Sequence, residues 1–238
     1  MKDRVALVTG GASGIGKASA RLLAEHGARV VVADVNADAA AATAREISGI
    51  SCTTDIGDSG AVAAMVARTL EAYGRIDVLL HAAGIFPRNP YFEMSDEAWR
   101  HVLRVNLDGT FYVTRDVGRV MKAQRAGTMI LMTSDRGIHG SADFAHYAAS
   151  KGGMLALVKS LALALGKDKV TVNGINPGLT DTPLARAGNP DWQQKQALDV
   201  LGGYSLPEQV AQIVLFLAAT GGAFMTGQIV SARMRHGA

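Results

Sequence analysis

The sequence predicts an α/β fold in which a doubly wound parallel sheet of seven strands carries helices on both faces. Short apolar runs alternate with alanine-rich stretches of helical length along the whole chain, which is typical of βαβ units around a parallel sheet. The 238 residues contain no internal repeat and no linker rich in Pro, Gly and Ser between two halves. We therefore expect residues 1–238 to form a single domain.

The strands are predicted where short apolar runs are bounded by turn residues. In chain order they are Val5–Thr9, Arg29–Asp34, Ile50–Thr54, Val78–Ala82, Thr128–Thr133, Thr171–Asn176 and Gln228–Val230. The longer stretches between them predict helices at Gly14–His26, Ala37–Ile47, Ser59–Tyr73, Asp96–Gln124, Ala145–Leu165 and Pro207–Ala218. Two irregular stretches remain, Gly84–Ser95 and Gly178–Leu206. Loops of this length are usually lids or binding loops.

The composition excludes several classes of protein. With 48% hydrophobic and 19% charged residues the chain is globular, and it is long enough to build a core without a disulfide or a metal. Cys52 is the single cysteine, and no Cys/His cluster has zinc spacing. The amino terminus resembles neither a signal peptide nor a membrane span, so we expect a cytoplasmic protein without a membrane partner. The net charge of +3 is scattered and aromatic residues are few, which argues against a nucleic-acid partner.

A glycine-rich turn follows the first predicted strand and opens the first predicted helix, as a phosphate-binding turn requires. Its sequence from Thr9 is TGGASGIG. The glycines permit tight turning and close approach, and the amides of the following helix would face a pyrophosphate. A plain strand-to-helix turn is the alternative. The candidate cofactor-binding residues here are Gly10, Ser13, Gly14, Ile15 and Gly16.

Asp34 ends the second predicted strand, 18 residues after Gly16. A carboxylate at this place can accept hydrogen bonds from both hydroxyls of an adenosine ribose. A 2′-phosphate would meet like charge there, so the sequence predicts NAD rather than NADP as the cofactor. The alternative is that Asp34 caps the helix predicted from Ala37.

Two further segments lie at the carboxyl ends of predicted strands. Asp55, followed by Ile56, could accept a hydrogen bond from an adenine amino group or cap the next helix. His81 is followed by Ala82, Ala83 and Gly84, and these small residues would let a cofactor lie against the backbone.

Tyr147 and Lys151 stand four residues apart in a predicted helix, so both side chains project from one face. A lysine ammonium near a phenol stabilises the phenolate and lowers its pKa toward the range of a general acid/base. Ser134 ends the fifth predicted strand at the same sheet edge, where its hydroxyl could bind a substrate oxygen. Asn106 lies inside a predicted helix and fits a buried polar network.

With these residues the chain resembles the short-chain dehydrogenase/reductase family over nearly its whole length. The resemblance rests on TGGASGIG, Asp34, Asp55, the HAAG segment, Asn106, Ser134, the YAASK motif, Asn176-Pro177-Gly178 and Thr182. It implies a Rossmann fold and hydride transfer between a nicotinamide and a carbinol carbon. It also implies that Tyr147 is the acid/base, Lys151 binds the nicotinamide ribose and depresses the tyrosine pKa, Ser134 orients the substrate oxygen, and Asn106 holds a water. Pro177, Gly178 and Thr182 would meet the nicotinamide carboxamide.

The chain departs from the family pattern at two places. The family's Asn-Asn-Ala-Gly segment reads His81-Ala82-Ala83-Gly84, so the amide at Ala82 is missing. The last residues, Ser231–Ala238, replace the usual strand that ends Asp-Gly-Gly.

The resemblance implies that residues 178–206, where members of the family vary most, form the substrate loop. In the loop 178–206, Leu179, Leu184, Trp192 and Leu198 could line an apolar pocket, and Arg186 and Lys195 could meet an anion; alternatively Trp192 anchors the loop and the charges face water. Arg136 and His139 are expected nearer the reacting centre, with His146 packed on another helix face. The helix from Met154 to Leu165 is apolar nearly all round, which predicts burial on more than one face. The resemblance implies that the second face meets another subunit in a homodimer or homotetramer.

These observations predict an NAD-dependent oxidoreductase, without metal, that acts on a small-molecule secondary alcohol and its ketone. The alternatives are a 3-oxoacyl thioester reductase of fatty-acid type, which usually goes with NADPH, and a non-catalytic NAD-binding regulator.

Overall fold

The computed structural model describes residues 1–189, 200–219 and 222–232. It contains the predicted seven-stranded parallel sheet, in the order β3-β2-β1-β4-β5-β6-β7. The strands are β1 (Val5–Thr9), β2 (Arg29–Asp34), β3 (Ile50–Thr53), β4 (Val78–His81), β5 (Gly127–Met132), β6 (Val170–Asn176) and β7 (Ile229–Ser231). The order reverses between β1 and β4, and at such a point the carboxyl ends of parallel strands leave a crevice for a ligand.

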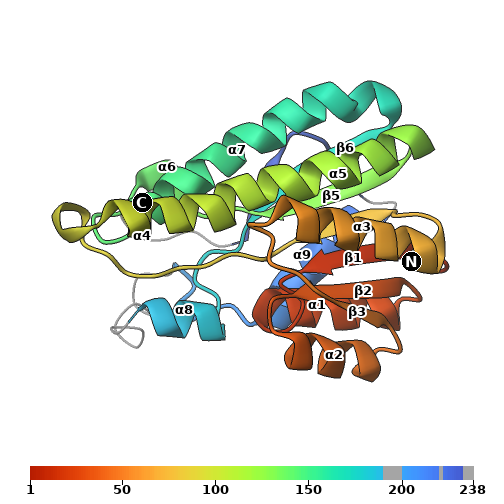
Figure 1. The fold of residues 1–238 in the computed structure, drawn as a ribbon, viewed down its shortest axis with the longest axis horizontal. Helices are drawn as coiled ribbons and strands as arrows, with labels where there is room; N and C mark the ends of the chain where they lie inside the picture. The colour runs from red at the N-terminus through yellow and green to blue at the C-terminus, as the bar shows by residue number, and fades with distance from the viewer. Residues whose placement is uncertain (190–199, 220–221, 233–238) are drawn as a thin grey trace.

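Helices cover both faces of the sheet (Figure 1). Their bounds are α1 (Gly14–Glu25), α2 (Ala37–Glu46), α3 (Ser59–Tyr73), α4 (Asp96–Leu103), α5 (Gly109–Gln124), α6 (Arg136–His139), α7 (Ala145–Leu165), α8 (Pro183–Gly188) and α9 (Pro207–Ala218), with short 3₁₀ turns at Tyr91–Glu93 and Gly166–Asp168. Helices α3, α5 and α7 lie on one face, and α1, α2 and α9 lie on the other.

The alternation of side chains along each strand builds two separate cores. Leu7 of β1 packs toward α3, α5 and α7, while its neighbour Val8 packs toward α1, α2 and α9. The same alternation separates Leu79 from Leu80 on β4. Since both faces are buried, the strands read as continuous apolar runs in the sequence.

The predicted helix over Asp96–Gln124 is present without a break, but it contains a π-helical turn that was not predicted. It consists of α4, the π-helical turn at Arg104–Asp108 that we call the π segment, and α5. A π turn adds a residue to the helix and commonly marks a functional position. Here it contains Asn106, whose side chain bonds to the loop after β4. The helices α6 and α8 were not predicted either, and α8 lies within the expected loop 178–206.

Helix α7 continues into the following 3₁₀ turn, and by length and apolar composition alone residues 145–168 could cross a membrane. Its buried residues Met154 and Val158 pack on the sheet in the core with α5. Its buried Lys151 donates a hydrogen bond to the backbone of β5. One side of α7 therefore packs in the protein core.

Candidate active site

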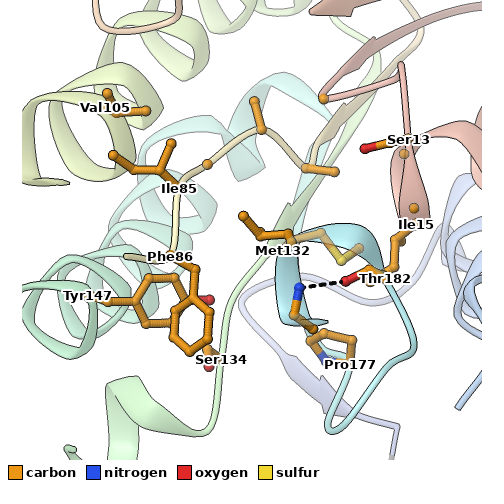
Figure 2. A pocket seen from close by; sticks show the side chains of 18 of the residues that line it. Ser13, Ile15, Ile85, Phe86, Val105, Met132, Ser134, Tyr147, Pro177 and Thr182 are labelled. Carbon is orange, nitrogen blue, oxygen red and sulfur yellow. Dashed lines mark hydrogen bonds between the residues drawn. The ribbon is translucent and has the colours of Figure 1, made fainter. Parts of the chain in front are cut away.

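A cavity of about 450 Å³ lies at the carboxyl edge of the sheet, over the point where the strand order reverses. Figure 2 shows Ser134, Phe86 and Tyr147 gathered on one side of it, with Ser13, Ile15 and Thr182 on the other. All but one of the predicted site residues line it: Gly10, Ser13, Gly14, Ile15, Gly16, Asp34, Asp55, Ile56, Ala82, Ala83, Gly84, Ser134, Tyr147, Lys151, Pro177, Gly178 and Thr182. The exception, Asn106, is buried behind the lining.

The glycine-rich turn can be built only with glycine at two positions. Gly10 has a φ of +69°, and a Cβ there would lie 2.7 Å from the backbone nitrogen of Ala83. A Cβ on Gly16 would lie 2.1 Å from the carbonyl oxygen of Gly10. Ser13 precedes α1 and makes no side-chain cap to it. The turn therefore brings the start of α1 close to β1 and β4 beside the cavity.

Asp34 lies at the cavity wall beside this turn. Its carboxylate accepts hydrogen bonds from the N–H groups of Ala12 and Asn36, each at 3.1 Å. The alternative that Asp34 caps α2 is excluded, because Asn36 is the cap and accepts from the N–H of Ala39 at 3.0 Å.

Asp55 does not cap α3 either, since Asp58 accepts the hydrogen bonds from the first N–H groups of that helix. Asp55 accepts from the N–H of Gly57 at 2.8 Å and from Arg104 at 3.1 Å. Burial acts to raise the pKa of Asp55, but the Gly57 N–H and Arg104 hold it below its usual value. Asp55 is thus a carboxylate at the cavity wall, tied to the π segment.

The sequence gives His81 as the first residue of the HAAG segment, and the structure adds that its ring joins β4 to two other parts of the site. Its Nδ1 lies 2.8 Å from Oγ1 of Thr9, and its Nε2 lies 3.0 Å from Oγ1 of Thr110. Thr110 donates its proton to the carbonyl of Asn106, so it accepts from Nε2–H, and Nδ1 accepts from Thr9. One buried ring therefore connects the glycine-rich turn to the π segment.

Asn106 occupies the buried polar position that the sequence predicts. Its Oδ1 accepts from the N–H of Ile85 at 2.8 Å, and its Nδ2 donates to the carbonyl of Ile85 at 2.9 Å. Nδ2 also lies 3.4 Å from Oγ of Ser150 on α7. The amide thus fixes the loop after β4 against α7.

Tyr147 and Lys151 face the cavity from one side of α7, and a hydrogen bond joins the side chains of Tyr147 and Ser134. Nζ of Lys151 donates to the carbonyl of Met132 at 2.6 Å and lies 5.6 Å from the centre of the Tyr147 ring. Burial lowers the pKa of Lys151 to about 8.

The expectation that Lys151 depresses the tyrosine pKa, which the resemblance implies, stays a prediction. Burial raises the pKa of Tyr147 above its usual value, while the hydrogen bond to Ser134 and the charge of Arg136 act to lower it. Arg136 on α6 is thus one cation that acts on the phenol.

An aromatic stack, which sequence reasoning missed, forms the wall around Tyr147. Phe86 stacks on Phe144 with ring centres 4.2 Å apart and meets the edge of Tyr147 at 4.6 Å. The guanidinium of Arg136 lies over both phenylalanine rings, at 5.3 and 4.4 Å. Because these residues come from two loops far apart in the sequence, only the aromatic character of Phe86 and Phe144 could have hinted at the stack.

Of the other residues that the sequence offers for substrate binding, some line the cavity and some do not. Leu179 and Leu184 line the cavity, as does Arg136. Arg186 pairs instead with Asp181 at 2.6 Å, and His139 is exposed outside the lining. Trp192, Lys195 and Leu198 lie outside the described residues. Of the atypical terminus, Ser231 and Ala232 bond to Asn176 on β6, and the rest lies outside the described residues.

Among the residues that the structure describes, no group of three His, Cys, Asp or Glu side chains could hold a metal ion. The cavity instead combines a glycine-rich turn at a strand-order reversal with a Ser-Tyr-Lys constellation. This combination defines a dinucleotide-binding oxidoreductase.

Comparison with known proteins gives the family. The model of a family described as "Enoyl-(Acyl carrier protein) reductase" matches residues 10–232. The chain is 35% identical to 3-oxoacyl-[acyl-carrier-protein] reductase FabG of Thermotoga maritima, over 97% of this chain and 96% of that protein. It is 37% identical to cis-4-hydroxycyclohexanecarboxylate dehydrogenase of Sinomonas cyclohexanicum, over 96% and 94%. The chain belongs to the short-chain dehydrogenase/reductase family.

A solved relative adds a cofactor to this comparison. The crystal structure of 3-ketoacyl-(acyl-carrier-protein) reductase from Brucella melitensis complexed with NADH superposes with a TM-score of 0.91, at 26% identity and over 97% of each chain. The fold predicted from the sequence is confirmed by this likeness and by the sheet itself.

Proposed function

We propose that the protein is an NAD(H)-dependent oxidoreductase that interconverts a secondary alcohol and its ketone, with Tyr147 as the general acid/base. The observation that carries this proposal is that the glycine-rich turn, Asp34 and the group Ser134, Tyr147 and Lys151 line one and the same cavity. A protein that only bound the dinucleotide would have no chemical need for the last three residues.

The residues present fit a dinucleotide. A Cβ on Gly14 would lie 3.1 Å from Thr182, so the glycine allows the start of α1 to approach the segment after β6 closely. The start of α1 would hold the pyrophosphate, since helix N-termini favour anions. Asp34 would hold the adenosine ribose, Asp55 and Ile56 the adenine, and Ala82, Ala83 and Gly84 would leave room along the backbone. Lys151, Pro177, Gly178 and Thr182 would hold the nicotinamide end.

When bound, NAD supplies the acceptor for the hydride that leaves the carbinol carbon. In the direction of oxidation, the alcohol O–H proton passes to the phenolate oxygen of Tyr147 while the C–H bond breaks and the carbonyl forms. Ser134 donates a hydrogen bond to the substrate oxygen and keeps it beside the phenol. In this account burial raises the pKa of Tyr147, and Ser134 and Arg136 act in the opposite direction and lower it in part. Asn106 keeps the loop after β4 in place.

The cavity wall suggests a class of substrate. Ile85, Phe86, Leu179 and Leu184 offer apolar surface around Tyr147, while Arg136 adds one positive charge. This lining favours a small or medium alcohol with an apolar or ring-bearing body, and the dehydrogenase of a hydroxycyclohexanecarboxylate among the relatives supports it. We assign residues 178–206 to the substrate loop of a single-domain enzyme.

A 3-oxoacyl thioester reductase is the second candidate, because a relative with 35% identity bears that name. The carboxylate of Asp34 argues against NADPH, the cofactor that usually accompanies this activity. A solved relative of that name is nevertheless complexed with NADH, so the choice of cofactor alone does not separate the two candidates.

The test combines cofactor titration with turnover. NADH and NADPH binding are followed by fluorescence, and reduced-nicotinamide absorbance is followed with aliphatic, cyclic, aromatic and acyl-thioester substrates. Tyr147→Phe should lower kcat by about 10²–10⁴-fold and leave NADH binding within about twofold. Substantial turnover in this variant would reassign the proton donor. Turnover confined to acyl thioesters would favour the second candidate.

A further inference from the structure

The helix that carries Tyr147 lacks an ordinary N-cap. Its cap position is Phe144, which has no side-chain acceptor for the first N–H groups of α7. Such groups need partners from side chains, backbone or water when a helix begins inside a protein. Tyr147 is the third residue of α7, so its N–H is one of the groups that need such a partner.

The partner of one of these N–H groups is the ring of His146. The N–H of Tyr147 donates to Nδ1 of His146 at 2.8 Å, and the His146 side chain is fully buried. Since Nδ1 accepts, the proton of a neutral ring lies on Nε2. Nε2 lies 3.0 Å from Oδ1 of Asn89, which accepts that proton. Burial lowers the pKa of His146 and outweighs the opposing effect of the Phe144 backbone, in keeping with a neutral ring.

Asn89 is itself held against the start of α7. Its N–H donates to the carbonyl of Asp143 at 2.8 Å, and the side chains of Arg88 and Asp143 pair at 2.7 Å. The stacked rings of Phe86 and Phe144 join the same two segments. Asn89 is therefore a fixed acceptor, able to select one tautomer and one orientation of the His146 ring.

We propose that His146 is a positioning residue for Tyr147: its ring, protonated on Nε2 and oriented by Asn89, supplies the acceptor for the Tyr147 N–H that the cap residue of α7 lacks. The role of Tyr147 in proton transfer comes from the proposed function, on which this inference rests. His146 does not touch the reacting atoms. It keeps the phenol at its place beside Ser134 by holding the backbone from which the phenol extends.

Two variants separate the two hydrogen bonds of the ring. The side-chain oxygen of Asn stands where Nδ1 of His stands, so His146→Asn keeps the acceptor for the Tyr147 N–H and loses the reach to Asn89. The longer side chain of Gln places its amide where Nε2 stands, so His146→Gln keeps the contact with Asn89 and loses that acceptor. His26→Gln is the matched control, because His26 is exposed at the end of α1.

The kinetic expectation follows from the position of the lost acceptor. His146→Gln should lower kcat about tenfold, because the first turn of α7 loses the acceptor for the Tyr147 N–H and the phenol is slightly displaced. His146→Asn keeps this acceptor and should lower kcat at most about threefold. The KM for NAD should stay within about twofold in both variants, and His26→Gln should match the wild type. Equal losses of kcat in the two variants, a larger loss in His146→Asn, or a change confined to the KM for NAD would overturn the proposal.

A measurement on the wild-type protein tests the same arrangement without turnover. In ¹⁵N-labelled protein at neutral pH, the His146 ring should show a proton on Nε2 and none on Nδ1 by NMR. In Asn89→Ala the ring should lose this single tautomer and kcat should fall, while NADH binding is retained. A protonated Nδ1 in the wild type contradicts the inference even if either His146 variant fails to fold. Failure of the proposed function would appear differently, as wild-type protein that binds NADH and turns over no substrate.

Discussion

The imidazole of His81 lies fully buried between two threonine hydroxyls, and burial together with the charge of Lys151 lowers its pKa to about 3. In the unfolded chain the same ring takes up a proton near pH 6.5. The stability that comes from the neutral ring is therefore present above pH 6.5 and is lost as the pH falls toward about 3.

This dependence of stability on pH can be measured by comparing the wild type with His81→Leu. His81→Leu removes both hydrogen bonds and should lower the free energy of unfolding at pH 7 by about 1–3 kcal/mol, because a buried hydroxyl loses its partner. The difference in the free energy of unfolding between wild type and variant should be smaller at pH 4.5. Only the wild type is destabilised at this pH, because the unfolded chain takes up a proton on His81 and the buried ring does not. Urea unfolding at the two pH values measures it, and a gap of equal size at both would contradict the neutral buried ring.

Asp34 sets a second expectation at this scale. Its carboxylate at the cavity wall would repel a 2′-phosphate, so Asp34→Ser should tighten NADPH binding roughly tenfold while weakening NADH binding. Fluorescence titration with both reduced cofactors measures the change. Asp38→Ser is the control, because Asp38 is exposed in the first turn of α2 and does not line the cavity. Unchanged selectivity in Asp34→Ser would remove the basis for preferring NAD.

At the scale of elements, α6 and α7 meet through glycine. A Cβ on Gly137 would lie 2.7 Å from the backbone of Lys151 and Gly152, whereas a Cβ on Gly152 would lie 3.3 Å from the carbonyl of Gly137. Gly137→Ala should therefore push α6 away from α7 and cost about 1–3 kcal/mol, and Gly152→Ala should cost much less, because helical alanine offsets the tighter contact. Thermal unfolding compares them, and similar losses in both variants would contradict the close approach at Gly137.

The strands could be predicted from the sequence, whereas the π segment and the aromatic stack could not. Apolar runs predicted all seven strands to within a residue or so, because both faces of a parallel sheet are buried. The π segment could not be predicted in this way. It depends on contacts of Asn106 with Ile85 and of Thr110 with His81, which join parts of the chain that are far apart. The Phe86–Phe144 stack was missed for the same reason.

For the whole molecule, the outer surface of α5 and α7 indicates association. The two helices run side by side along one face (Figure 1), and Phe111 and Leu163 are 48% and 86% exposed there. We expect a homodimer or homotetramer that covers this apolar surface. Light scattering at micromolar concentration should give the mass of two or four chains, and Leu163→Glu should shift it toward one. Arg45→Glu, an exposed change on α2 at the opposite face of the sheet, is the control. A monodisperse wild-type monomer would contradict the expectation.

At this scale the sequence predicted where the site lies better than how it is held together. The carboxyl ends of the strands brought together every predicted cofactor residue, because motif positions follow strand ends. The ties between loops, such as His146 with Asn89 and Asp55 with Arg104, depend on the path of the chain between motifs. Motif spacing carries no information about that path.

The strand order has a consequence for how the protein acquires its shape after synthesis. The glycine-rich turn leaves β1 and rests against the residues after β4, and the Thr9–His81 hydrogen bond there joins positions 72 residues apart. The pairing of β1 with β2 needs only the beginning of the chain, whereas β1 and β4 must close a long loop first. Parallel pairings of this kind form slowly. In a refolding experiment, the capacity to bind NADH should therefore return with the slow phase that closes β1 onto β4, after much of the helical signal has already recovered.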